Sequence, residues 1–152
     1  MIESRLRTTQ LGLAAFSFVG LFLELLLRDH YQVTVQYVPF GLISIGLIGV
    51  ALVVLRPARW SIVALRIIGL TIAAGALVGI LFHLRANVAF EREIVGDAPL
   101  GELLRFAIKG ASPLLAPGAL GLGGGLLVTA TYRHPGLQGA APGTTASPGA
   151  DG

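Results

Sequence analysis

The chain has no cysteine among its 152 residues, and this absence excludes several kinds of site. A protein without thiols forms no disulfides, binds no metal through thiolates and has no cysteine nucleophile. Charged residues are also scarce: they make up 12% of the sequence, whereas soluble domains carry about 25%. A water-soluble fold of this length would therefore have too little polar surface to cover its apolar residues.

Several familiar functional motifs are missing as well. The sequence contains neither the GxSxG motif of serine hydrolases nor the HExxH motif of zinc enzymes. The glycine-rich stretch GLGGG at 121–125 fails the GxGxxG nucleotide pattern, because Leu126 stands where the last glycine belongs. The eleven basic residues are scattered and have no interleaved aromatics, so nucleic acid is not an expected partner.

Long apolar runs dominate what is present, since 54% of the residues are hydrophobic. A helix needs roughly 17 to 25 apolar residues to cross the hydrocarbon of a bilayer. The sequence therefore predicts an all-α fold, a four-helix transmembrane bundle in the plasma (inner) membrane with the lipid bilayer around it. The four predicted spans cover residues 11–27, 38–55, 62–82 and 113–130.

Proline, serine and arginine mark the ends of these runs. Pro39 stands at the start of the second run, and Ser112 and Pro113 form an N-cap and first-turn pair before the fourth. Ser61 is an N-cap candidate for the third run. Arg66 lies one turn into that run, close enough to its end to extend toward the lipid head groups.

Basic residues beside short loops predict the orientation of the bundle. Such residues favour the cytoplasmic side, and the tight connection between the second and third runs is basic. Both termini are therefore expected in the cytoplasm, with residues 1–134 forming the membrane domain. Residues 135–152 are rich in Gly, Pro, Ala, Ser and Thr and are predicted to be a disordered tail. The arginines on the predicted cytoplasmic side are Arg5, Arg7, Arg56, Arg59, Arg66 and Arg133.

The segment 85–112 is the most charged part of the chain and is predicted to be an outer loop with structure of its own. Within it, apolar residues recur at helical spacing and charged residues lie opposite, so we expect an amphipathic helix on the membrane surface or capping the bundle. The apolar residues of this pattern are Leu100, Leu103, Leu104, Ala107 and Ile108.

Glycines at a spacing of four residues predict close helix packing. Gly75 and Gly79 form a GxxxG pair in the third run, and Gly121 and Gly125 form one in the fourth. Contact between helices of one chain is the simpler interpretation. Formation of a homodimer, or contact with another membrane protein, is the alternative.

Three segments, HLRANVAFEREI, GASPLLAPG and TYRHP, resemble a family of small bacterial four-span membrane proteins of uncharacterised function. The resemblance covers roughly residues 80 to 136. It implies the same topology and implies no activity or cofactor.

The predicted topology brings polar residues of the first and third runs to the outer end of the bundle. In the simplest hypothesis they are structural and the protein is an accessory or interaction protein, with Glu24 paired to Arg28. Alternatively, Glu24, His83 and Glu91 bind a divalent metal or relay protons. An enzyme that uses a histidine and a carboxylate is the third hypothesis. The cluster comprises Glu24, Arg28, His30, His83, Asn87, Glu91 and Glu93.

Overall fold

The computed structural model describes residues 2–96, 98–110 and 114–137 of the chain, and this part is helical without strands. The all-α prediction is confirmed. Two short 3-10 helices, Thr34–Gln36 and Pro135–Leu137, accompany the longer elements. The α-helices are α1 (Ile2–Leu27), α2 (Tyr37–Leu55), α3 (Arg59–Val95), α4 (Leu100–Ile108) and α5 (Leu115–Thr131).

Three stretches of the chain are long and apolar enough to cross a membrane: α1, the segment Thr34–Leu55 that contains α2, and α3. The prediction of long apolar helices is thus confirmed for three of the four runs. The fourth, α5, is apolar but has 17 residues, which gives a length of about 26 Å. A hydrocarbon core is about 30 Å thick, so α5 is a little short for a span without help from its flanking residues.

The helices extend beyond the apolar runs at two places. α1 begins at Ile2 rather than at residue 11. α3 continues to Val95 rather than ending at residue 82, so residues 85–95 of the predicted outer loop belong to this helix. These residues contain no glycine or proline to stop the helix. α3 ends at Val95, and Gly96 follows with a φ of +65°, a value that glycine adopts far more readily than other residues.

The start of α5 also differs from the prediction. Ser112 and Pro113 lie outside the described residues, and α5 begins at Leu115. Pro117 then falls in the first turn of the helix, where its missing N–H costs nothing because first-turn donors have no helical partner.

The core of the bundle is centred on Phe18 of α1, which is fully buried. Its ring lies between two glycines of other helices. A Cβ added to Gly46 of α2 would stand 2.7 Å from the ring, and one added to Gly123 of α5 would stand 2.5 Å from it. Real carbon atoms do not approach this closely, so both positions require glycine for three helices to close around one aromatic side chain.

α3 and α5 cross in backbone contact at Gly69 and Gly124. A Cβ on Gly69 would lie 2.8 Å from the carbonyl oxygen of Gly124, and a Cβ on Gly124 would lie 2.7 Å from that of Gly69. Small residues let helix backbones approach in this way, which is the packing expected inside a bilayer.

Of the four glycines predicted to pack, three meet side chains of their own chain. Gly75 faces Leu42, Gly79 faces Pro117, and Gly121 faces Ala76 of α3. Gly125 is different, because nothing lies within 4 Å of the place where its Cβ would be. Packing within one chain is therefore confirmed for Gly75, Gly79 and Gly121.

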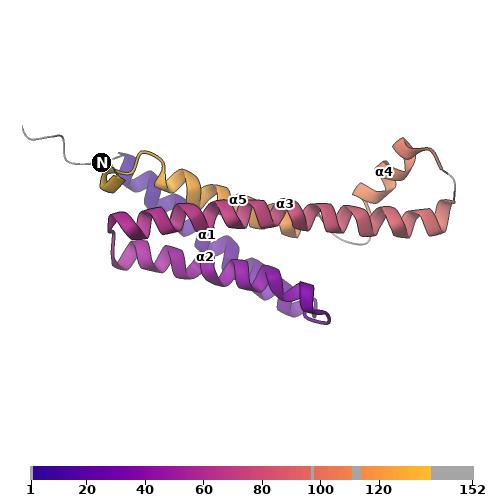
Figure 1. The fold of residues 1–152 in the computed structure, drawn as a ribbon, viewed down its shortest axis with the longest axis horizontal. Helices are drawn as coiled ribbons and strands as arrows, with labels where there is room; N and C mark the ends of the chain where they lie inside the picture. The colour runs from indigo at the N-terminus through magenta and orange to yellow at the C-terminus, as the bar shows by residue number, and fades with distance from the viewer. Residues whose placement is uncertain (1, 97, 111–113, 138–152) are drawn as a thin grey trace, which may run out of the picture.

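The far part of α3 and the helix α4 form an arm, defined here as residues 84–96 and 98–110. Figure 1 shows α3 running well past the other helices of the bundle, with α4 folded back along its far end. Within the part of the chain that the structure describes, α4 packs against α3 and no other helix. Leu103 and Ala107 of α4 are buried in this contact. The amphipathic helix is confirmed, but it does not cap the bundle.

Candidate functional site

Polar side chains gather at both ends of the bundle. The arm end is where α1 finishes and α3 leaves the bundle. The terminal end is where α1 begins, α2 turns into α3, and α5 finishes. The predicted candidate residues belong to the arm end and to the arm.

His30 and His83 meet at the arm end. Their rings are stacked, with centroids 6.4 Å apart and an interplanar angle of 13°. His30 follows α1 and His83 lies within α3, just after the apolar run 62–82. The prediction that the end of α1 shares a level with this part of α3 is therefore confirmed for the two histidines.

Glu24 pairs with Arg28 across one turn of α1. The Arg28 Nε donates to the Glu24 Oε1 at 3.1 Å. Both side chains are largely exposed, at 43% for Glu24 and 62% for Arg28, so the pair contributes little stability in water. The carboxylate is thus occupied by its own helix, as the structural hypothesis predicts.

The turn after α1 is held by its own side chains. Asp29 has a φ of +50°, and its Oδ1 accepts a 2.6 Å hydrogen bond from the Tyr31 hydroxyl. This bond and the charge of Asp29 raise the pKa of Tyr31, because both favour the protonated phenol. The Gln36 Oε1 accepts from the backbone N–H of Gln32 and of Val33 and closes the turn before α2.

Asn87 is directed at α4 rather than at the histidines. Its side chain is buried, and its Nδ2 donates to the carbonyl oxygen of Ala107 at 2.8 Å. Gly110 completes the fit, since a Cβ there would lie 2.7 Å from the Asn87 Cγ. Asn87 therefore joins the two helices of the arm.

The metal set proposed from the sequence is not assembled. Among the described residues, no group of three or more His, Asp or Glu side chains is placed to hold a metal ion. His83 and Glu91 are eight residues apart on one helix, which separates them by about 12 Å, whereas protein nitrogen and oxygen ligands lie about 2 Å from zinc. Glu91 is half-buried on the arm, and Glu93 is exposed there.

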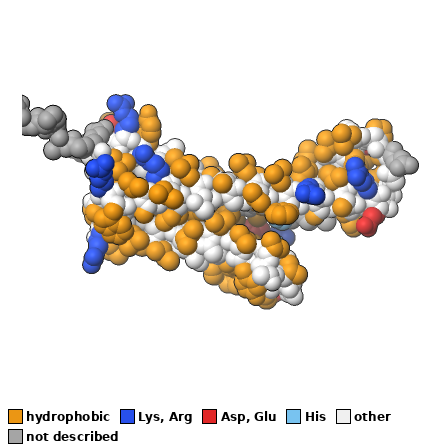
Figure 2. All heavy atoms as spheres, in the orientation of Figure 1, with side chains coloured by type: hydrophobic (Ala, Val, Ile, Leu, Met, Phe, Trp, Pro, Cys, Tyr) orange, Lys and Arg blue, Asp and Glu red, His pale blue; other side chains and the backbone are white. Residues whose placement is uncertain are grey.

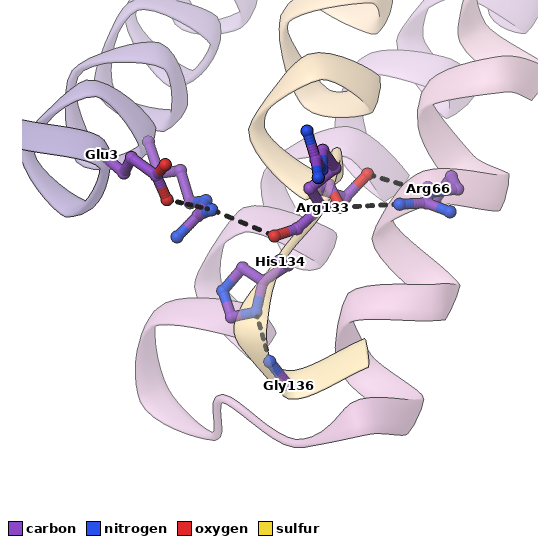
Figure 3. Close-up of polar contacts among 7 residues, drawn as sticks. Glu3, Arg66, Arg133, His134 and Gly136 are labelled. Atoms are coloured by element: carbon purple, nitrogen blue, oxygen red, sulfur yellow. Dashed lines mark hydrogen bonds and ion pairs between the residues drawn. The ribbon is translucent and has the colours of Figure 1, made fainter. Parts of the chain in front are cut away.

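At the terminal end, Arg66 caps α5 (Figure 3). Its Nη2 donates to the backbone carbonyl of Thr131 at 2.6 Å, and its Nε donates to the Thr131 hydroxyl at 3.2 Å. The last carbonyls of a helix have no partner within the helix and carry partial negative charge. The guanidinium thus joins α3 to the end of α5, and the expectation that it extends to the lipid head groups stays a prediction.

Arg7 links the start of α1 to the chain after α5. Its Nη2 donates to the Glu3 carboxylate at 3.4 Å and to the backbone carbonyl of Arg133 at 3.2 Å. Arg133 has a φ of +46°, an unusual conformation for a side chain without special local bonding. The chain then turns so that the Nδ1 of His134 accepts the N–H of Gly136 at 3.1 Å (Figure 3).

The surroundings of His134 lower its pKa. Partial burial is the larger cause, and the positive charge of Arg7 adds to it, since both disfavour the imidazolium form. Gly136 packs against Ile62 of α3, so this turn is part of the bundle. The predicted disordered tail thus begins no earlier than residue 138, and residues 138–152 lie outside the described part.

A groove of about 630 Å³ opens beside these contacts, between α1 and the end of α5. The sequence analysis did not identify it, because its two walls come from residues 126 positions apart. The sequence feature related to this groove is the presence of arginines near both ends of the membrane domain, Arg7 and Arg133. The lining residues are Glu3, Leu6, Arg7, Gln10, Thr129, Tyr132, Arg133 and Pro135.

No family model, curated protein or solved structure matches this chain. The resemblance to small four-span membrane proteins therefore stays a prediction.

Proposed function

We propose that the chain is a small integral membrane protein that acts as an accessory or interaction protein and presents its arm to a protein partner outside the bilayer. The apolar run of α3, residues 62–82, is about 31 Å long, which matches the thickness of a hydrocarbon core. Charged residues begin directly after it, so α3 leaves the lipid near His83.

Exposed apolar side chains on the arm carry this proposal. Phe90 and Ile94 of α3 are 50% and 65% exposed, and Ile108 of α4 is 65% exposed. In Figure 2 hydrophobic side chains cover much of the visible face of the arm, with a few charged groups between them. Single exposed apolar side chains are ordinary, but contiguous apolar patches mark contact sites, and Phe90 and Ile94 lie one turn apart on the same face of α3.

The charges support one orientation. Basic side chains gather at the terminal end (Figure 2), whereas the arm mixes both signs. Positive residues beside short loops favour the cytoplasm. We therefore place both termini in the cytoplasm and the arm on the opposite side of the plasma membrane, the inner membrane of a bacterium.

Photo-crosslinking in native membranes tests the proposed contact. A photoreactive amino acid placed at Phe90 or at Ile108 is expected to give a discrete protein adduct. The matched controls are Val78 and Leu122, which are similarly exposed on α3 and α5 but lie within the apolar runs. These two positions are expected to label lipid alone.

Two outcomes of this experiment have different meanings. An adduct of twice the mass of the chain identifies the partner as a second copy. Lipid adducts alone from Phe90 and Ile108 would contradict the proposal, because the arm would then lie on the membrane surface.

A further inference from the structure

The groove at the terminal end combines features that suit one class of ligand. Its walls are helix α1 and the end of α5, at the end of the bundle that meets the membrane surface in the proposed orientation. Leu6, Tyr132 and Pro135 give it apolar sides. Arg7 and Arg133 give it positive charge.

The electrostatic balance at this end is strongly positive. Glu3 is the one acid that accompanies the arginines among the described residues there, and its side chain is 83% exposed. Its 3.4 Å contact with Arg7 is long and solvated, so it neutralises little of the charge. The arginines are Arg5, Arg7, Arg56, Arg59, Arg66 and Arg133.

The groove also presents hydrogen-bond donors. The Arg7 side chain is 16% exposed and is held by two bonds that both use Nη2, so within the described part of the chain its Nε and Nη1 are left to donate. The Gln10 Nε2 donates to the Thr129 hydroxyl, and this bond joins α1 to α5. The planar guanidinium fork of Arg7 matches the oxygens of a phosphate.

An apolar surface continues from the groove toward the middle of the bundle. One turn farther along each wall lie Leu13 of α1, which is exposed, and Gly125 of α5, which has open space where a Cβ would be. Leu122 follows on α5 and is exposed as well. A ligand with a phosphate in the groove and hydrocarbon below it would cover this surface.

We propose that the groove between α1 and α5 binds the head group of an anionic phospholipid, with its phosphate on Arg7 and Arg133 and an acyl chain over Gly125. This inference rests on the proposed membrane location. Basic pockets between helices on the cytoplasmic side recognise anionic lipids through the same chemistry. Tyr132 at the rim is amphipathic, as residues at the interface between lipid and water usually are.

Native mass spectrometry of the full chain, purified in a neutral detergent, tests this site. Phosphatidylglycerol is titrated against phosphatidylcholine, with inorganic phosphate as a third probe. Phosphatidylglycerol is expected to bind more tightly than phosphatidylcholine. Arg133→Gln is expected to weaken its binding about fivefold, the effect of about 1 kcal/mol per basic residue. This variant keeps the backbone carbonyl that Arg7 uses, so the fold is retained.

Two further variants sharpen the test. Arg59→Gln removes the same charge at the same end of the bundle but outside the groove, and its effect is expected to stay below about twofold. Glu3→Gln removes the acid that competes for Arg7, so the lipid should bind more tightly. Equal losses in Arg133→Gln and Arg59→Gln would overturn the site, because they would show a general surface effect.

The lipid probes separate the remaining outcomes. Equal binding of phosphatidylglycerol and phosphatidylcholine would contradict the proposed site and leave the membrane location intact. Binding of inorganic phosphate that depends on Arg133, without binding of the lipid, would assign the groove to free phosphate and overturn the lipid proposal. Recovery of the wild-type chain from the soluble fraction would contradict the membrane location itself.

Discussion

At the scale of single residues, the bundle depends on which glycines face a neighbour. The sequence identified the spaced pairs, and three of their four members pack as predicted. The second run's Gly41, Gly46 and Gly49 were also expected to thin that helix, and Gly46 packs against Phe18, but Gly123 and the backbone contact of Gly69 with Gly124 were not identified. Each run is apolar on all sides, so hydrophobic periodicity does not show which face of a helix points inward.

A pair of glycine substitutions on α5 tests this packing. Gly123→Ala places a Cβ against the Phe18 ring and is expected to destabilise the bundle by about 1–3 kcal/mol. Gly125→Ala is the matched control, two residues away with open space around it, and should leave stability unchanged or slightly higher. The melting temperature in detergent measures both. Equal melting temperatures for the two variants would contradict the assigned core.

His134 makes the turn after α5 sensitive to acid. Its Nδ1 must be unprotonated to accept the N–H of Gly136, and its pKa is lowered by burial and by Arg7. The pKa of His134 is lower in the folded chain than in the unfolded chain. Its contribution to the stability of the fold is therefore complete above the unfolded pKa, about 6.5. This contribution is lost as the pH falls through the lower pKa that His134 has in the folded chain.

Nuclear magnetic resonance of the His134 ring measures this directly. The ring is expected to titrate below the ordinary histidine pKa, and amide exchange at residues 135–137 should rise in the same pH range. Arg7→Gln should move the titration upward by removing the second cause, with burial still acting. A titration at or above the ordinary value would show that the turn leaves the imidazole in water.

At the scale of elements, the existence of each helix was predicted better than its ends. α4 was found from its amphipathic spacing, and the end of α2 at residue 55 was predicted correctly. The end of α3 was placed at residue 82, because the apolar run stops there. The helix continues since residues 83–95 favour helix as strongly as those before them, and Gly96 provides the stop.

Asn87 is expected to control whether α4 stays on α3. Asn87→Ala removes the buried bond to the Ala107 carbonyl, which keeps its 3.2 Å bond from the Gly110 N–H, so the expected cost is about 1 kcal/mol. Hydrogen exchange across residues 100–108 should accelerate, while exchange in α1 and α2 stays unchanged. Glu93→Ala, an exposed position on the same helix, is the control. Unchanged exchange in α4 would show that its apolar contacts hold it without Asn87.

At the scale of the whole molecule, the sequence predicted which ends of the helices meet but not what the side chains there do. The stacking of His30 on His83 and the nearness of the start of α1 to the end of α5 follow from the predicted topology. Among the described residues the proposed metal set is not assembled, because His83 and Glu91 lie about 12 Å apart along α3. The groove needed the pairing of α1 with α5, which no local pattern encodes.

The central claim is that the arm and the termini lie on opposite sides of a membrane. The absence of cysteine in the chain makes the test direct, because any single introduced cysteine is the only thiol. Gly101→Cys lies in open space on α4, and Pro57→Cys lies exposed in the turn between α2 and α3. A membrane-impermeant maleimide applied to intact spheroplasts should label residue 101, and should label residue 57 only after the membrane is opened. Labelling of both residues in intact spheroplasts, or of residue 57 alone, would contradict the account.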